Sequence, residues 1–206
     1  MTWVIIALVL IVAVGPVLYL LPSAKDKRLM NLRQAARQQG LGVRMTCVPN
    51  LAPELSERVN AAGERLDPSI NCVAYERPIR ANLPPLKDLQ LLKVPDNPTI
   101  PIVPAIEGWA YGQANPGREQ VGDEPQDSGG GSAGGAGADV LGDPDLESQL
   151  LALIARFPSD TLAVEINNKY IACLWLERST AESEVVDQIS SIGEQLEALL
   201  NRHMNG

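Results

Sequence analysis

Few residues of this chain have the types and spacing that enzymatic chemistry requires. The 206 residues include one histidine, His203, which lies close to the C-terminus. A single histidine excludes metal sites built from several imidazoles and disfavours a Ser–His or Cys–His nucleophile pair. Cys47, Cys72 and Cys173 form no C-x-x-C pair, and their apolar, strand-like surroundings favour buried, unreactive thiols. We therefore predict no catalytic residues, no cofactor and no metal site.

Carboxylates are the remaining groups that could do chemistry. Glu76, Glu107 and Glu165 could supply an acid–base pair if folding brought them together in a pocket. Asp143, Asp145 and Glu147 lack the spacing of a calcium loop, and helix capping explains them better. An enzyme that uses carboxylates is therefore the alternative hypothesis.

The first element is an apolar run without a charge, Trp3 to Leu21. As a helix, these nineteen residues would span roughly 28 Å, close to the thickness of the bilayer hydrocarbon. Only Met1 and Thr2 precede the run, so it lacks the basic start of a signal peptide. Residues 1–22 are therefore predicted to be a transmembrane anchor.

A basic segment follows the apolar run. Residues 23–48 carry six basic groups against one acidic group, a net charge of +5, although the whole chain carries −8. Positive charge after the span predicts an external N-terminus and a cytoplasmic C-terminal part. The acidic remainder argues against nucleic acid as a partner. The residues expected at the bilayer surface are Trp3, Tyr19, Lys25, Lys27 and Arg28.

Residues 112–143 differ from the rest of the chain in composition. They are rich in Gly, carry a net charge of −5 and include the run from Asp127 to Ala138. Such a segment cannot bury enough apolar surface to offset its chain entropy. We predict a disordered linker.

The segment before this linker, residues 23–111, reads as a basic helix and the first part of an α+β domain. We expect a helix over 25–39, a strand over 41–47 and a second helix that starts at Pro53. A strand over 71–79 should follow, and then extended chain, because six prolines lie between Leu83 and Tyr111.

The sequence of the segment after the linker, residues 144–206, predicts a helix, a β-hairpin and a second helix. Pro144 takes a first helical position, and Asn167-Asn168 suits a hairpin turn between strands 162–166 and 169–176. The hairpin should place Leu162 on the same face as Val164. A final amphipathic helix follows Ser179. Because this unit is small for a lone core, we expect it to complete the sheet begun by residues 41–79.

Several stretches of sequence resemble a group of uncharacterised inner-membrane proteins of gammaproteobacteria. The stretches are 18–23 (LYLLPS), 32–37 (LRQAAR), 40–43 (GLGV), 163–165 (AVE) and 174–176 (LWL). Some members of the group are labelled as similar to the small accessory subunit of the preprotein translocase. The resemblance implies an N-terminal anchor in the bacterial inner membrane and a cytoplasmic tail, and it implies no activity.

Together these features predict an α+β protein with an N-terminal transmembrane helix and a cytoplasmic domain that the disordered linker interrupts. The predicted function is a non-catalytic protein-interaction or accessory (scaffold) role at the inner membrane. Its partners would be the lipid bilayer and another inner-membrane or cytoplasmic protein. The candidate partner surface is formed by Trp109 and Tyr111, because aromatic residues in a proline-rich segment beside a linker suit a recognition site. The alternative reading is that these rings cover the edge of the core.

Overall fold

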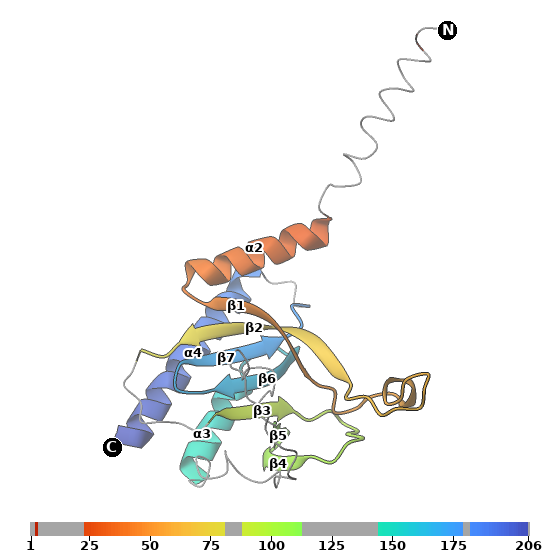
Figure 1. Cartoon of the computed structure of the whole chain (residues 1–206). Helices are drawn as coiled ribbons and strands as arrows, with labels where there is room; N and C mark the ends of the chain where they lie inside the picture. Colours follow the sequence, from red (N-terminus) through yellow and green to blue (C-terminus); the bar gives the residue numbers. More distant parts are fainter. Residues whose placement is uncertain (1–2, 4–22, 81–87, 113–143, 179–181, 206) are drawn as a thin grey trace, which may run out of the picture.

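The chain forms an α+β structure around an antiparallel sheet (Figure 1). The computed structural model describes Trp3 and residues 23–80, 88–112, 144–178 and 182–205. The strands are, in chain order, β1 Gly42–Pro49, β2 Ser69–Pro78, β3 Leu89–Lys93, β4 Val103–Ile106, β5 Trp109–Tyr111, β6 Thr161–Ile166 and β7 Tyr170–Trp175. The described helices are α2 Ala24–Gln38, α3 Pro144–Ile154 and α4 Glu182–Asn205, with the short 3₁₀ helix η1 Leu55–Glu57.

The seven strands have the order β1-β2-β7-β6-β3-β5-β4, and every pair is antiparallel. The hairpin β6–β7 therefore lies in the middle of the sheet, between β2 and β3. Tyr75 on β2 pairs with Cys173 on β7, and Leu91 on β3 pairs with Val164 on β6. The segments that flank residues 113–143 thus belong to one sheet.

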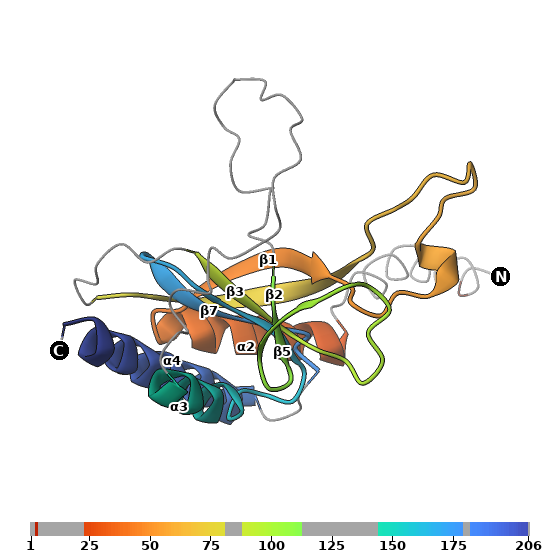
Figure 2. The ribbon, with the colours of Figure 1, turned by 90° about the horizontal axis from the view of Figure 1, so that it is seen from below.

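Helices α2, α3 and α4 cover one face of this sheet (Figure 2). The main core lies between the helices and the sheet, where the rings of Tyr75 and Trp175 meet edge to face at 5.3 Å. The apolar stripe expected on the last helix is buried, and all of it except Leu199 belongs to this core. Its buried members are Val185, Val186, Ile189, Ile192, Leu196, Leu199 and Leu200. A regular spacing of three and four residues explains why the sequence predicts this face.

Local signals define both ends of α2. At its start, the Ser23 hydroxyl accepts a hydrogen bond from the Asp26 backbone N–H, and the Asp26 carboxylate accepts one from the Ser23 N–H. The Ser23 hydroxyl also donates to this carboxylate at 2.7 Å, and the hydrogen bonds donated by the Ser23 hydroxyl and N–H lower the pKa of Asp26. After α2, Gly40 takes a φ of +77°, which turns the chain back toward β1. Helix α2 therefore begins and ends within one residue of the expected bounds.

The hairpin β6–β7 forms with its turn at Asn167-Asn168, and the Asn167 side chain accepts hydrogen bonds from the N–H groups of Lys169 and Tyr170. One residue differs from the expected pattern. The pairing shifts between Thr161 and Ala163, so Leu162 packs in the cluster on the helix-free face and not beside Val164. A bulge adds one residue and reverses the alternation beyond it.

The second helix expected from Pro53 is wrong. Residues 50–68 contain only η1 and an isolated bridge between Val59 and Arg65. The reason is local turn chemistry: the Asn60 side chain accepts hydrogen bonds from the N–H groups of Ala62 and Glu64. Such bonds compete with helical ones and fold the chain back on itself. We call residues 50–68 the arm.

The expected membrane-anchored architecture is also corrected. Among the described residues, no helix has both the length and the apolar composition that crossing a bilayer requires. Trp3 is described as helical and exposed, whereas residues 4–22, with Tyr19, lie outside the described residues. The described helices α2, α3 and α4 each bury one side in the core and turn polar groups outward. On this finding, the prediction of a single-pass inner-membrane protein with a cytoplasmic domain is wrong.

The predicted disordered linker falls almost wholly on residues 113–143, which lie outside the described part, as does Ser179. Gly112, at the start of the linker, is described. Its N–H donates to the carbonyl oxygen of Gln90, which continues the pairing of β5 with β3 by one residue.

Truncation of Leu196 to alanine tests the packing of α4 on the sheet. Leu196 is fully buried in the main core, so Leu196→Ala should lower the free energy of unfolding by about 2–5 kcal/mol. Arg202→Ala is the matched control, because Arg202 is exposed on the same helix and its truncation should change stability little. Urea unfolding followed by circular dichroism measures both. Equal effects of the two substitutions would contradict the described orientation of α4.

Candidate functional site

The arm projects beyond the sheet between β1 and β2 (Figures 1 and 2). Backbone hydrogen bonds close it at its base, where the Asn50 N–H donates to the Pro68 carbonyl oxygen at 2.8 Å. Further out, the Leu66 N–H donates to the Arg58 carbonyl oxygen at 2.8 Å. The arm is therefore a folded projection with its own hydrogen bonds.

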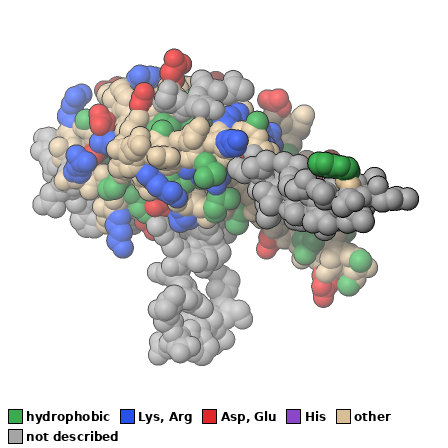
Figure 3. All heavy atoms as spheres, turned by 90° about the horizontal axis from the view of Figure 1, so that it is seen from above, with side chains coloured by type: hydrophobic (Ala, Val, Ile, Leu, Met, Phe, Trp, Pro, Cys, Tyr) green, Lys and Arg blue, Asp and Glu red, His purple; other side chains and the backbone are tan. Residues whose placement is uncertain are grey.

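The arm carries large apolar side chains that face solvent. Leu55 is 80% exposed, and Val59 and Leu66 are each 46% exposed. At the base, by contrast, Leu51 is buried, and its carbonyl oxygen accepts a hydrogen bond from the Thr99 N–H. Figure 3 shows the arm at the lower right, with hydrophobic side chains on its surface. Exposed apolar side chains on an anchored projection are typical of an interaction surface.

A polar cluster lies on the helix-free face of the sheet. The Arg44 Nε donates to Glu76 at 2.6 Å, and its Nη2 lies 3.5 Å from a Glu165 oxygen. The Gln90 amide also donates to Glu165, at 2.9 Å. Residues from four strands, β1, β2, β3 and β6, are thereby joined. Two of the candidate carboxylates, Glu76 and Glu165, are brought together on one arginine.

The third candidate carboxylate, Glu107, is exposed in the turn between β4 and β5 and does not join this cluster. Within the described part of the chain, no three His, Cys, Asp or Glu side chains are grouped so that they could hold a metal ion. The contacts of Glu76 and Glu165 with Arg44 make the cluster a link between strands. The cluster consists of ion pairs between Arg44 and these two carboxylates.

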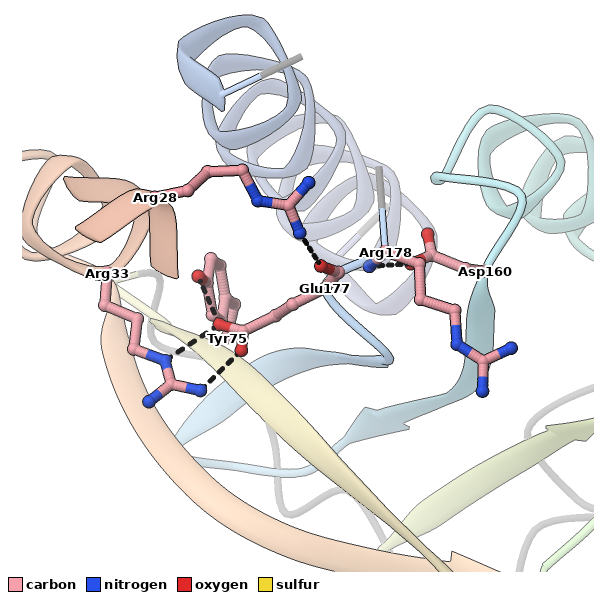
Figure 4. A network of polar contacts seen from close by, with 6 residues as sticks. All are labelled: Arg28, Arg33, Tyr75, Asp160, Glu177 and Arg178. Atoms are coloured by element: carbon pink, nitrogen blue, oxygen red, sulfur yellow. Dashed lines mark hydrogen bonds and ion pairs between the residues drawn. The ribbon is translucent and has the colours of Figure 1, made fainter. Parts of the chain in front are cut away.

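A second polar network lies at the end of β7, around Glu177 (Figure 4). The Arg33 guanidinium binds the Glu177 carboxylate with two hydrogen bonds, of 3.0 and 2.5 Å. The Tyr75 hydroxyl donates to the same carboxylate at 2.9 Å, and Arg28 donates to the Glu177 carbonyl oxygen at 2.9 Å. Because Arg28 and Arg33 both come from α2, their hydrogen bonds to Glu177 hold that helix against the sheet.

Glu177 is unusual in both its environment and its backbone. It is only 4% exposed, and its φ of +53° makes it the one non-glycine residue with positive φ among the described residues. A carboxylate that is buried needs partners of opposite charge, and Arg33 supplies them. Hydrogen bonding to Glu177 raises the pKa of Arg33. Burial, together with the charge of Glu177, raises the pKa of Tyr75.

The aromatic residues that we expected to form a partner surface lie on β5. Trp109 is 8% exposed and belongs to the main core, and Tyr111 is half-buried against the same core. Burial also raises the pKa of Tyr111. The structure thus places both rings over the core, as in the alternative reading of the sequence.

Lysine and arginine residues of α2 that were expected at a bilayer surface have different environments in the structure. Lys25 and Lys27 are exposed on α2, whereas Arg28 turns inward to Glu177. The residues that sequence reasoning missed are those of the arm and Glu177. Leu55 and Val59 lie four residues apart after Pro53, a spacing that fits a helix and accounts for the incorrect prediction of one there. No sequence signal marks Glu177 as a residue with positive φ.

The architecture and the site define an α+β protein with a helix-covered sheet and a projecting arm. Comparison of the chain with protein-family models, with curated proteins and with solved structures gives no match. The function is therefore inferred from the described surfaces.

Replacement of Glu177 tests the network that holds α2. Glu177→Gln keeps the shape of the side chain but leaves Arg33 without a counter-charge. Because the Arg33 side chain is 29% exposed, we expect a loss of about 2–3 kcal/mol, below the full cost of breaking a buried pair. Arg178→Ala, at an exposed neighbouring position, is the control and should be near neutral. Urea unfolding of Glu177→Gln, Arg33→Met and the double variant gives the coupling energy. A coupling near zero would contradict the network.

The three thiols should differ sharply in reactivity. Burial raises the pKa of Cys72 and of Cys173 to about 12, whereas Cys47 is exposed on β1. Since the thiolate is the reactive form, we expect one thiol to react with a thiol reagent in the native protein and three after unfolding. Cys47→Ser should abolish the native reaction. Rapid native labelling of that variant would show that a buried thiol is accessible.

Proposed function

We propose that this chain is a protein-interaction domain with an accessory or scaffold role, and that it contacts its partner through the arm. The observation that carries the proposal is the exposure of Leu55, Val59 and Leu66 on a projection anchored at its base. Burial of such a side chain in an interface contributes about 1.5–3 kcal/mol. Three of them could therefore supply the apolar centre of a binding surface.

The composition of the arm also supports an interface. Glu54, Glu57, Arg58, Glu64, Arg65 and Asp67 surround the apolar side chains in sequence. A polar rim around an apolar centre is the usual anatomy of a protein interface. In addition, the internal hydrogen bonds of the arm reduce the entropy that would be lost on binding.

An enzyme that uses carboxylates is the weaker candidate. It is favoured by the approach of Glu76 and Glu165 to each other on the helix-free face. Both carboxylates, however, are bonded to Arg44, and Glu165 is also bonded to Gln90. These contacts suit a link between strands better than a general acid and a general base.

Site-specific photo-crosslinking tests the role of the arm. A crosslinking amino acid at Ser56 stands beside Leu55 and leaves that side chain intact, because Ser56 is exposed on η1. In the source cell we expect a covalent adduct with another protein from Ser56. The matched position Lys169, exposed in the β6–β7 turn, should give no adduct.

Leu55→Glu in the same chain should weaken the adduct at least about tenfold, because a charge would replace an apolar contact of the interface. Co-purification of the partner with the wild-type chain gives an independent readout. Recovery of the protein only as itself, with no adduct at Ser56, would overturn the proposal. Equal adducts at Ser56 and Lys169 would also overturn it, because they would indicate random contacts.

A further inference from the structure

Helix α2 is attached to the rest of the structure differently from α4. Of the fifteen residues of α2, only Leu32 and Ala36 are buried, whereas the apolar stripe of α4 is buried from Val185 to Leu200. Helix α2 also contributes no strand, and all seven strands pair with one another without it. The strand pairing of the sheet therefore does not include α2.

Polar contacts supply much of the attachment of α2. Arg33 binds the Glu177 carboxylate with two hydrogen bonds, and Arg28 donates to the Glu177 carbonyl oxygen. At the C-terminal end of the helix, the Gln39 amide donates to the Asp187 carboxylate on α4. The Arg33 side chain is 29% exposed, so salt ions can screen its attraction to Glu177. The attachment of α2 is therefore sensitive to ionic strength.

The position of Glu177 is fixed by contacts that do not involve α2. Asp160 holds the backbone on both sides of this residue (Figure 4). Its carbonyl oxygen accepts a hydrogen bond from the Leu176 N–H at 3.3 Å, and its carboxylate accepts one from the Arg178 N–H at 2.8 Å. The Tyr75 hydroxyl, on β2, donates to the Glu177 carboxylate. Glu177 therefore keeps its place and one hydrogen-bond partner when α2 leaves.

Separation of α2 from the sheet leaves no charge buried without a partner. The guanidinium groups of Arg28 and Arg33 move into water with the helix. The Glu177 carboxylate retains the Tyr75 hydroxyl and gains contact with water where the guanidinium groups had covered it. Breaking a buried ion pair is costly when one charge stays behind in an apolar interior. Here both charges become solvated, so that cost is avoided.

We propose that α2 is a releasable helix: it leaves the sheet as a unit while all seven strands stay paired, and Glu177 controls how often it does so. Release frees Arg28 and Arg33 and uncovers the apolar surface on which Leu32 and Ala36 pack. The domain thereby has two forms that offer different surfaces to a partner. This device goes beyond the proposed role of the arm and does not depend on it.

Hydrogen exchange of the full wild-type chain, measured by mass spectrometry, tests the proposal without any substitution. A helix as short as α2 is marginal in water once it has left the sheet, so its amides then exchange with solvent. We expect protection factors in α2 at least about tenfold lower than in the central turns of α4. Low concentrations of urea should leave α2 exchange nearly unchanged and accelerate α4 exchange, because α4 exchanges by global unfolding. Added sodium chloride should accelerate α2 exchange at least about threefold.

Two carboxylate-to-amide substitutions test the role of Glu177. Glu177→Gln removes the counter-charge of Arg33 and should lower the protection of α2 at least about tenfold. Glu194→Gln is the matched control, because Glu194 pairs with Arg77 at 3.0 Å and links β2 to α4. That pair is intact in both the docked and the released form of α2. Glu194→Gln should therefore leave α2 exchange unchanged.

Equal protection of α2 and α4 in the wild-type chain, with the same urea dependence, would overturn the proposal, because α2 would then leave only when the whole domain unfolds. Exchange of α2 that does not respond to salt would also overturn it, as would equal effects of Glu177→Gln and Glu194→Gln on α2. The wild-type measurements decide whether α2 is released even if Glu177→Gln fails to fold. Crosslinking at Ser56 does not depend on these outcomes, so its failure rejects the arm alone.

Discussion

The position of α2 depends on one buried carboxylate. Glu177 receives hydrogen bonds from Arg33 and Tyr75 on its side chain and from Arg28 on its backbone. Its positive φ costs free energy for a residue with a Cβ, and glycine would adopt this conformation more easily. Glycine, however, has no carboxylate to pair with Arg33. The strained backbone is thus tolerated because the charge at this position holds a helix against the sheet, beside the edge strand β1.

The order of the strands makes the two halves of the chain dependent on each other. The hairpin β6–β7 fills the centre of the sheet, so the strands before residue 113 cannot form a continuous sheet without it. Trp175 on β7 and Tyr75 on β2, one hundred residues apart in sequence, are in ring contact within the core. Pairing of such distant segments forms slowly, because the entropy of closing a long loop is lost before the contacts are made. The arm and edge β1 are therefore carried by a scaffold whose middle comes from the C-terminal part of the chain.

Elements with a regular local period were predictable from the sequence, and features set by tertiary contacts were not. The spacing in α2 and α4 and the Asn167-Asn168 turn specify their elements locally. The same reasoning failed after Pro53, because the side chain of Asn60 organises a turn where spacing suggested a helix. The burial of Trp109 depends on its partner strand β3 and on helices far away in sequence, so its aromatic type alone could not decide between core and surface.

The same contrast explains why the candidate site was only partly foreseen. Glu76 and Glu165 were recognised as candidate carboxylates, but their spacing in sequence could not show that Arg44 joins them. That contact has a consequence at the edge of the sheet. An arginine on an edge strand normally keeps other strands away, and here two carboxylates draw it inward across alanine positions. The helix-free face thereby stabilises the sheet with the charge that would otherwise protect β1. Since β4 is short, irregular and contains a proline, the open edge at β1 is a specific feature of this fold, and the basic helix held by Glu177 lies next to it.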